Sequence, residues 1–197
     1  MRIFVVGSLN MDLVIKAPFM PENGMTIGGE GFMTNPGGKG ANQAAAIGKL
    51  GGNVRMVGCV GEAFGDELKS VLEGYGVDTR CVKKLGGVSS GIAVIVVVDG
   101  DNRIILDAGA NARVSEALVD EALAEAEAGD YLVAQLEIGL PVVEYALEKA
   151  KEKGMVTMLN SRQRRNCPKR RFPLRLFYPQ PIGSGVYTGI RPADEVC

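Results

Sequence analysis

The sequence lacks two residue types altogether: its 197 residues include no histidine and no tryptophan. Without histidine, the chain offers neither histidine acid–base catalysis nor histidine metal ligands. Its four cysteines, Cys59, Cys81, Cys167 and Cys197, are scattered and form no Cys-x-x-Cys pair. Scattered cysteines are typical of free thiols in a reducing compartment, so the sequence predicts a cytoplasmic protein.

Long apolar runs are also missing. The longest, residues 92–98, is far shorter than the ~20 residues of a membrane-spanning helix. The chain starts directly with an apolar segment, residues 3–6, and shows no signal-peptide pattern. The formal net charge of −1 favours neither nucleic acid nor a membrane surface, so we expect no such partner. The apolar content of 46% is enough for the core of about one domain.

Glycine is abundant, and its densest cluster lies in residues 35–48, Asn-Pro-Gly-Gly-Lys-Gly-Ala-Asn-Gln-Ala-Ala-Ala-Ile-Gly. This stretch is predicted to begin as a loop and end as a helix, because helix formers follow Gly40. A glycine turn entering a helix leaves backbone N–H groups at the positive end of the helix dipole. Lys39 adds a mobile cation, and Asn42 adds an amide that donates and accepts. The pattern predicts a site for a polyhydroxylated or anionic ligand; a glycine-rich helix start is the simpler alternative.

Two common glycine motifs are excluded. A P-loop requires glycine six residues before the lysine and serine or threonine directly after it, but the chain has Met33 and Gly40 there. A dinucleotide fingerprint requires Gly-x-Gly-x-x-Gly after the first strand, and residues 7–10 read Gly-Ser-Leu-Asn instead.

Four segments together resemble a known family. Residues 37–44 (Gly-Gly-Lys-Gly-Ala-Asn-Gln-Ala) resemble the substrate loop of the ribokinase group within the PfkB family of carbohydrate kinases. Residues 7–12 resemble the opening motif of that family, and residues 108–111 and 135–137 follow in the expected order. The similarity covers residues 1–160. The lysine in the loop favours the ribokinase group over fructokinase and ketodeoxygluconate kinase relatives.

The resemblance implies an α/β fold with three layers, in which helices cover a central, mostly parallel sheet and a small β-sheet forms a lid. It also implies ATP-dependent phosphorylation of D-ribose to D-ribose 5-phosphate, with Mg²⁺ and a monovalent cation such as K⁺. A homodimer formed through the lid sheet is implied as well. Two alternatives stay open: a kinase for deoxyribose or another pentose, and a non-catalytic sugar-binding or dimerising fragment.

The candidate site residues follow strand ends or open a helix. Asn10 and Asp12 come just after a predicted strand, where α/β sheets place ligands, although both residue types also favour turns. Glu137 follows another apolar strand, where it binds a sugar hydroxyl or simply caps the next helix. No catalytic residue and no metal ligand is predicted, and Lys39 is not expected to be a nucleophile. The predicted substrate-binding residues are Asn10, Asp12, Gly38, Lys39, Asn42 and Glu137.

Alternation of strands and helices predicts the main layers, and its interruptions predict the lid. The lid is expected from about residues 12–34 and 80–107, with a hairpin turn at residues 99–102. Residues 91–98 are apolar on both faces, so the lid sheet needs cover on both sides, for which a partner subunit is one source. The other predicted strands are residues 3–6, 54–60, 131–136 and 155–159, and the predicted helices include residues 40–50, 116–128 and 142–153.

The character of the chain changes after Asn160. Residues 161–172 are rich in arginine and contain no acid, which would suit a basic arm or a divergent loop. We favour a frameshift, because a codon choice exists for which a shifted frame encodes Pro-Ala-Lys-Glu-Glu-Leu-Pro-Glu-Glu-Ala-Phe, similar to a helix of the family. A shifted frame of residues 179–186 likewise restores an Asn-x-x-Glu motif that the family associates with phosphate and magnesium.

Three segments are therefore expected: residues 1–160 as the first part of the α/β domain, residues 161–186 out of frame and irregularly coiled, and residues 187–197 as a family-like remnant. The resemblance places the nucleotide and cation sites, and a Gly-Ala-Gly-Asp motif with the general-base aspartate, beyond residue 197. We accordingly expect no ribose phosphorylation from these residues alone.

Overall fold

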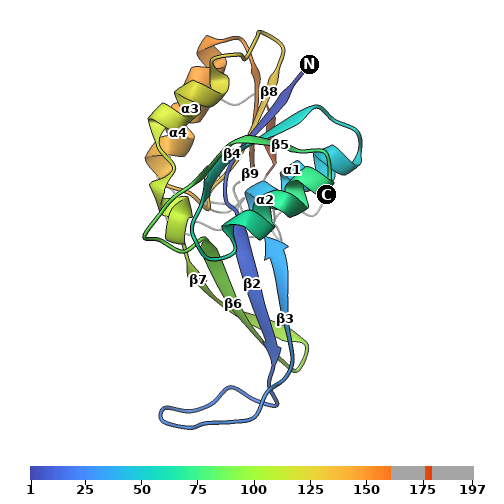
Figure 1. Cartoon of the computed structure of the whole chain (residues 1–197), viewed down its shortest axis with the longest axis vertical. Coiled ribbons are helices and arrows are strands. Elements are labelled where there is room, and N and C mark those ends of the chain that lie inside the picture. The colour runs from blue at the N-terminus through green and yellow to red at the C-terminus, as the bar shows by residue number, and fades with distance from the viewer. Residues whose placement is uncertain (161–175, 179–197) are drawn as a thin grey trace, which may run out of the picture.

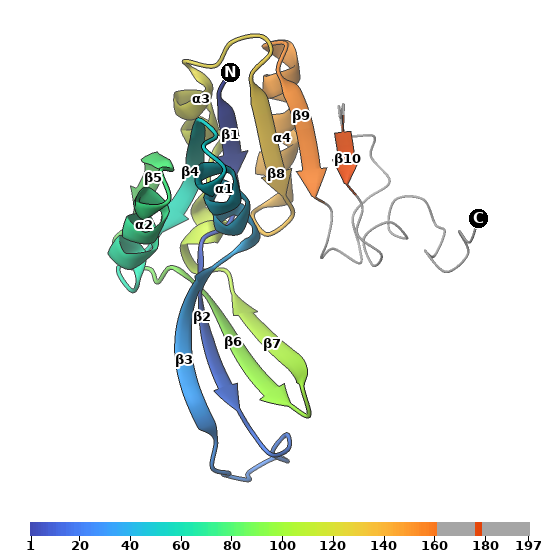
Figure 2. The same ribbon diagram turned by 90° about the vertical axis from the view of Figure 1, so that its right-hand side faces the viewer.

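The computed structural model describes residues 1–160 and 176–178, which form two sheets (Figure 1 and Figure 2). The larger sheet has the strand order β10-β9-β8-β1-β4-β5, and every neighbouring pair in it is parallel. Its strands are β1 (Ile3–Val6), β4 (Val54–Val60), β5 (Asp78–Lys84), β8 (Tyr131–Gln135), β9 (Val156–Asn160) and β10 (Leu176–Tyr178).

Helices cover both faces of the larger sheet, as Figure 2 shows. Helices α1 (Lys39–Lys49) and α2 (Gly65–Gly74) lie on one face, and α3 (Glu116–Leu123) and α4 (Leu140–Glu152) lie on the other. The side chain of Ser115 caps α3 by accepting a hydrogen bond from the Leu118 N–H. This arrangement confirms the predicted three-layer α/β fold.

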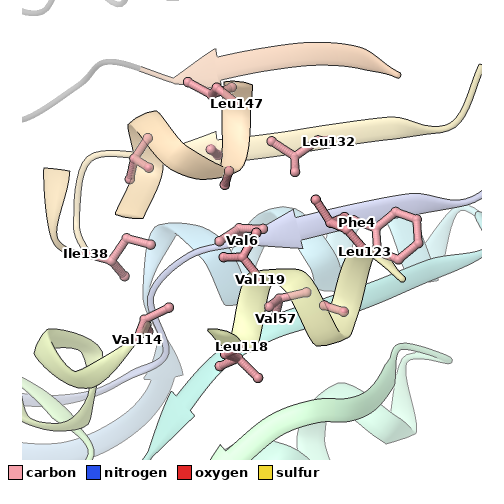
Figure 3. Packing of buried hydrophobic residues seen from close by; sticks show 14 of the residues in the cluster. Phe4, Val6, Val57, Val114, Leu118, Val119, Leu123, Leu132, Ile138 and Leu147 are labelled. Carbon is pink, nitrogen blue, oxygen red and sulfur yellow. The ribbon is translucent and has the colours of Figure 1, made fainter. Parts of the chain in front are cut away.

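The central strands explain why the layers hold together. In β1, Phe4 and Val6 point into the core shared with α3 and α4, whereas Val5 points into the core beneath α1 and α2. Figure 3 shows Leu132 and Leu147 in the first of these cores. All five side chains are fully buried. A strand that is apolar at every position suits a parallel sheet with both faces covered.

The smaller sheet extends away from the larger one (Figure 1). Its strands β2 (Asn10–Lys16), β3 (Glu30–Gly37), β6 (Gly91–Val98) and β7 (Asp101–Asp107) have the order β3-β2-β6-β7. Strands β2 and β6 are parallel, and the two outer pairs are antiparallel. This sheet corresponds to the predicted lid.

The predicted hairpin between β6 and β7 is confirmed. Val98 pairs with Asp101, so Asp99 and Gly100 form a two-residue turn. Their φ angles of 53° and 82° are both positive, as a type I′ turn requires. Aspartate followed by glycine is a favoured pair for such turns, because glycine adopts positive φ without steric cost.

Two predictions about the smaller sheet are wrong. Residues 80–85 were expected in the lid, but β5 is an edge strand of the larger sheet, parallel to β4. Helix α2 is the crossover that joins these two strands and makes them a βαβ unit. Strand β3 begins at Glu30 and continues through residues 35–37, which were expected to be a loop.

Helix α3 also ends at Leu123, short of the predicted residue 128. The tract from residue 161 to 186 lies outside the described residues except for β10, and the same is true of all of residues 187–197. At β10 the structure shows a strand parallel to β9, where irregular coil was expected. Within the described part of the chain, no helix combines the length and the apolarity needed to cross a membrane.

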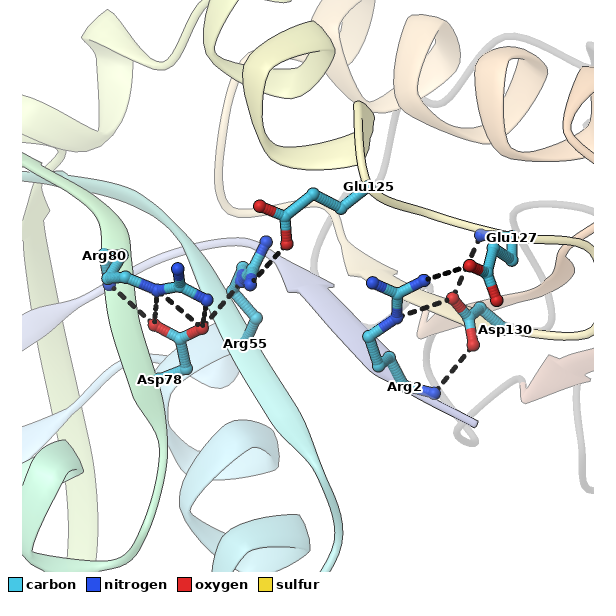
Figure 4. A network of polar contacts seen from close by, with 7 residues as sticks. All are labelled: Arg2, Arg55, Asp78, Arg80, Glu125, Glu127 and Asp130. Carbon is cyan, nitrogen blue, oxygen red and sulfur yellow. Dashed lines mark hydrogen bonds and ion pairs between the residues drawn. The ribbon is translucent and has the colours of Figure 1, made fainter.

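Ion pairs join strands of the larger sheet near their amino-terminal ends (Figure 4). Asp78 of β5 accepts hydrogen bonds from Arg55 of β4 and from Arg80. Burial raises the pKa of the Asp78 carboxyl, but the bonds from the two guanidinium groups outweigh it and lower the pKa below its ordinary value. At the start of β1, Arg2 pairs in the same way with the buried Asp130. Both networks join neighbouring strands, so we assign them a structural role.

Candidate functional site

The candidate site lies at the carboxyl ends of β1 and β8. These strands are neighbours, but the chain runs from β1 to β4 on one side and returns later to β8 on the other. Such a reversal of strand order is where open α/β sheets bind ligands. Ser8 follows β1 and Glu137 follows β8, so polar groups from both strands meet at this point.

A cleft of about 170 Å³ lies at this point, between the larger sheet and the smaller one. All six predicted substrate-binding residues line this cleft; that they bind a sugar stays a prediction. The apolar part of the cleft wall comes from β6 and β7 and consists of Ala93, Ile95, Ile104 and Leu106. The polar part contains all six candidates: Asn10, Asp12, Gly38, Lys39, Asn42 and Glu137.

Glu137 is the most heavily bonded of these residues. Its Oε2 accepts hydrogen bonds from Ser8 Oγ at 2.6 Å and from the Lys39 backbone N–H at 2.9 Å. Its Oε1 pairs with Lys39 Nζ at 2.5 Å. The Glu137 side chain is only 9% exposed and that of Lys39 19%, so the pair is largely withdrawn from solvent. Lys39 is therefore held in place, and the prediction of a mobile cation is wrong.

The ionisation of Glu137 follows from these contacts. Burial by itself raises the pKa of the Glu137 carboxyl, because it disfavours the charged form. The hydrogen bonds from Lys39 and Ser8, together with the charge of Lys39, outweigh burial and lower the pKa below its ordinary value. Glu137 is thus an ionised carboxylate at neutral pH.

The start of helix α1 also differs from the prediction. Its first backbone N–H groups were expected to face a ligand, but other parts of the chain already satisfy them. The Lys39 N–H donates to Glu137, the Gly40 N–H donates to Ser8 Oγ at 3.3 Å, and the Ala41 N–H donates to the Ser8 carbonyl at 2.9 Å. Side chains, rather than helix N–H groups, are therefore left to contact a ligand.

The same contacts exclude one of the two interpretations of Glu137, and sugar binding stays a prediction. Glu137 does not cap the helix that follows it in sequence, because the N-cap position of α4 is Gly139, without a side-chain cap. Glu137 instead caps α1 across the cleft, since Gly38 at the N-cap of α1 has no side chain to do so. The carboxylate thereby ties the end of β8 to the glycine loop.

The glycines of the loop allow this close approach. Gly38 has a φ angle of 93°, which side-chain-bearing residues rarely adopt. A Cβ atom at Gly38 would lie 2.8 Å from the Ser8 carbonyl oxygen, and one at Gly40 would lie 2.6 Å from the Ser8 backbone nitrogen. Both positions therefore require glycine for the loop to pack on the end of β1.

Asp12 is the second carboxylate in the cleft, and its environment is the opposite of that of Glu137. No hydrogen bond to the Asp12 side chain occurs within the described part of the chain. Burial raises the pKa of the Asp12 carboxyl above its ordinary value, and the nearby charge of Glu137 raises it further. Asp12 is thus a carboxylate that a ligand's hydroxyl donors could satisfy.

Two residues of the site were not predicted. Ser8 is fully buried and donates its hydroxyl to Glu137, and Asn111 donates its side-chain amide to Asn10 Oδ1 at 2.7 Å. Both lie in segments that resemble family motifs, at residues 7–12 and 108–111. Their position within those motifs was the signal in the sequence that could have identified them as site residues.

As a whole, the cleft offers carboxylate acceptors, amide groups and one cation beside an apolar wall. Hydroxyl groups both donate and accept, so this mixture suits a small polyhydroxylated ligand. No cluster of three or more acidic or cysteine side chains that could hold a metal ion occurs among the described residues. We assign no metal-dependent step to these side chains.

Comparison with known proteins agrees with this chemistry. The sequence matches the pfkB family carbohydrate kinase over residues 1–174. Ribokinase of Schizosaccharomyces pombe is 44% identical over 167 residues, which are 81% of this chain and 52% of that protein. Deoxyribokinase of Salmonella typhi is 38% identical over 162 residues, 81% of this chain and 53% of that protein.

A solved structure with similar architecture is that of Arabidopsis thaliana ribokinase complexed with ribose and ATP. It superposes with a TM-score of 0.81 at 27% sequence identity, over 98% of this chain and 64% of that chain. The present chain thus spans about half the length of the two curated relatives described above.

Proposed function

The chain belongs to the pfkB family of carbohydrate kinases, and we propose that its cleft binds D-ribose for phosphorylation by ATP to D-ribose 5-phosphate. The ribokinase relatives support the choice of sugar, and the Arabidopsis thaliana enzyme, whose structure contains ribose and ATP, supports both substrates. Because the chain spans about half of these curated relatives, the proposal concerns the activity of the whole protein.

The observation that carries the proposal is the convergence of five polar side chains and Gly38, from three separate segments, on one cleft. In this proposal Asp12 and Glu137 accept hydrogen bonds from sugar hydroxyls, and Lys39, Asn42 and Asn10 donate to them. Phosphoryl transfer depends mainly on positioning and on charge stabilisation, so holding the sugar in one orientation is a contribution to catalysis. Lys39 acts as a hydrogen-bond donor and not as a nucleophile.

A second candidate is a kinase for deoxyribose or another pentose, which the deoxyribokinase of Salmonella typhi favours. A third is a sugar-binding or dimerising protein without turnover. The described residues provide no cluster for a metal ion, so Mg²⁺ and K⁺ enter the proposal through the family alone and carry no step here.

We also propose the cytoplasm as the compartment, because Cys59 and Cys81 are free thiols.

We further propose that the smaller sheet joins two copies of the chain. Val94 of β6 and Ile105 of β7 are paired neighbours on the face opposite the cleft. Both are exposed, Ile105 to 71%. An apolar sheet face of this kind is typical of an interaction surface, and a second copy would cover it.

Isothermal titration calorimetry tests the sugar assignment. Ribose, 2-deoxyribose and fructose are titrated into the chain, into Asn42→Ala, and into a control variant Asn102→Ala, which changes an exposed asparagine of β7 outside the cleft. We expect ribose to bind best and Asn42→Ala to weaken its binding about tenfold, whereas Asn102→Ala leaves it unchanged.

If 2-deoxyribose binds more tightly than ribose, 2-deoxyribose is the substrate instead. If no pentose binds, the proposal is contradicted. A coupled assay for ADP with ribose and magnesium ATP, carried out on the whole protein, then separates turnover from binding. It distinguishes the kinase from the non-catalytic alternative.

A further inference from the structure

Asn111 occupies a buried position behind the cleft. It lies in the short 3₁₀ helix η1 (Gly109–Arg113) that follows β7, and it is only 2% exposed. Its Oδ1 accepts a hydrogen bond from the Leu9 backbone N–H at 3.0 Å. Its Nδ2 donates to the Leu9 carbonyl at 3.1 Å and to Asn10 Oδ1 at 2.7 Å. All of the amide's polar atoms are thus used by residues 9 and 10.

The Leu9 backbone fixes the positions of Oδ1 and Nδ2 in the Asn111 side-chain amide. A backbone N–H only donates and a backbone carbonyl only accepts, so Asn111 must present Oδ1 to the first and Nδ2 to the second. Side-chain amide orientations are otherwise assigned from their surroundings, and here the surroundings allow a single choice. With Nδ2 of Asn111 as the donor, Asn10 must present its own Oδ1 to it.

This arrangement also fixes the position of the Asn10 amino group, Nδ2. Asn10 Nδ2 makes no hydrogen bond to any residue in the described part of the chain. Asn10 lines the cleft and also an adjoining cavity of about 240 Å³, which Asn111 lines too. The amino group of Asn10, which can only donate, is therefore the part left for a ligand.

The contact between the two asparagines is also tightly enclosed. Gly91, the first residue of β6, pairs with Asn10. A Cβ atom at position 91 would overlap both Asn10 Oδ1 and Asn111 Nδ2. The absence of a side chain at Gly91 thus leaves the space that the amide pair occupies.

We infer that Asn111 is a positioning residue that makes Asn10 an obligatory hydrogen-bond donor to the substrate. The inference rests on the proposed function for the identity of that substrate. It deepens the proposal, because Asp12, two residues further along β2, is a carboxylate that accepts when ionised. The cleft then selects a sugar whose hydroxyl oxygen accepts from Asn10 while another hydroxyl donates to Asp12.

A double-mutant cycle tests whether Asn111 acts through Asn10. Ribose affinity is measured by calorimetry for the unmodified chain, Asn10→Ala, Asn111→Ala and the double variant. We expect Asn111→Ala to weaken ribose binding about tenfold in the unmodified chain and less than about twofold once Asn10 is alanine. An equal loss in both backgrounds would overturn the inference, since Asn111 would then act independently of Asn10.

Asn111→Asp separates polarity from packing. The carboxylate keeps the shape of the side chain and can still accept from the Leu9 N–H, but it cannot donate to Asn10. Asn10 should then turn its amino group toward residue 111 and present its oxygen to the sugar. We expect ribose affinity to fall at least as far as in Asn111→Ala, with Asn102→Ala as the unchanged control. Wild-type affinity in Asn111→Asp would contradict the inference.

A measurement without ligand keeps this inference apart from the proposed function. Hydrogen exchange followed by NMR should show a protected Leu9 backbone amide that exchanges at least about tenfold faster in Asn111→Ala. If that protection is found but no pentose binds, the amide orientation stands and the proposed substrate is wrong. An unprotected Leu9 amide in the unmodified chain would overturn the inference whatever the sugar results.

Discussion

Both sheets of the molecule contain apolar strand residues, yet only the larger sheet has helices covering both of its faces. In β1 of the larger sheet, Phe4, Val5 and Val6 are fully buried between two layers of helices. In β7 of the smaller sheet, every residue is exposed, including Ile104 and Ile105. Apolar composition therefore gives stability where helices cover it, and gives a surface for a ligand or partner where they do not.

The cleft lies where the two sheets meet, and each sheet contributes one carboxylate. Glu137 follows β8 of the larger sheet and is held by Lys39 and Ser8, so its pKa is lowered. Asp12 belongs to β2 of the smaller sheet, where burial without a bonding partner raises its pKa. The carboxylate beside the larger sheet is thus already held in place by the fold, whereas that of the smaller sheet has no hydrogen bond to the described residues.

The largest expected difference between the sheets is in stability. Leu132→Ala removes a fully buried side chain from the core shown in Figure 3. We expect it to lower the free energy of unfolding by about 2–5 kcal/mol, measured by chemical denaturation. For the single chain, Ile105→Glu should change that free energy by less than about 0.5 kcal/mol, because the side chain is exposed there.

The same pair of variants tests the proposed interface. Ile105→Glu should reduce self-association in sedimentation velocity, since a charge in an apolar contact between two copies is costly to bury. A large loss of stability in Ile105→Glu would mean that the smaller sheet is part of the core after all, and the comparison would fail. Unchanged sedimentation would remove this face from the interface.

A smaller effect is expected at the Lys39–Glu137 pair. Lys39→Met leaves the Glu137 carboxylate largely buried without its cation, and we expect a loss of about 1–3 kcal/mol in the free energy of unfolding. The exposed pair Lys83–Glu121, with an N–O distance of 2.6 Å, provides the control. Lys83→Met should cost less than about 1 kcal/mol.

The pH dependence gives this prediction a second readout. Because the folded-state pKa of Glu137 is lowered, its stabilisation is present above its ordinary pKa of 4.5 and is lost as the pH falls through the folded value. Glu137→Gln should therefore differ most from the unmodified chain near neutral pH, and the difference should shrink in acid. A difference that is constant from pH 7 to pH 3 would contradict the assigned ionisation.

The sequence predicted the larger sheet better than the smaller one for a physical reason. Apolar strands alternating with helices identified most of the parallel sheet, but β5 was assigned to the lid because α2 was not recognised as its crossover. Residues 35–37 were taken for a loop because they contain proline and glycine. Proline is tolerated in β3 because this is an edge strand that pairs only with β2.

The sequence predicted those residues of the site that local motifs identify. Strand ends and the glycine loop identified Gly38 and all five polar side chains that line the cleft. The roles of Ser8 and Asn111 could not be predicted, because they depend on contacts between distant segments. Asn111 bonds to Leu9 across 102 positions, and no local pattern encodes that distance.

The smallest expected effect on stability, with the opposite sign, is at Asp12. Its raised folded-state pKa means that its contribution to stability is complete below the ordinary pKa of 3.8 and is lost as the pH rises through the folded value. Ionised Asp12 therefore costs stability near neutral pH when no ligand is bound. Asp12→Asn should stabilise the ligand-free chain at pH 7 by about a few tenths of a kcal/mol, because solvent screens a half-buried group, and the gain should vanish near pH 3.

The same change should harm binding. An amide cannot replace a carboxylate that accepts from two hydroxyls, so both Asp12→Asn and Asp12→Ala should weaken ribose binding by about 1–3 kcal/mol in calorimetry. A gain in stability together with a loss of affinity is typical of a residue kept for function at the expense of the fold. If Asp12→Asn instead destabilised the ligand-free chain and left ribose affinity unchanged, Asp12 would belong with the structural charges of the larger sheet, and the contrast between the two carboxylates would be wrong.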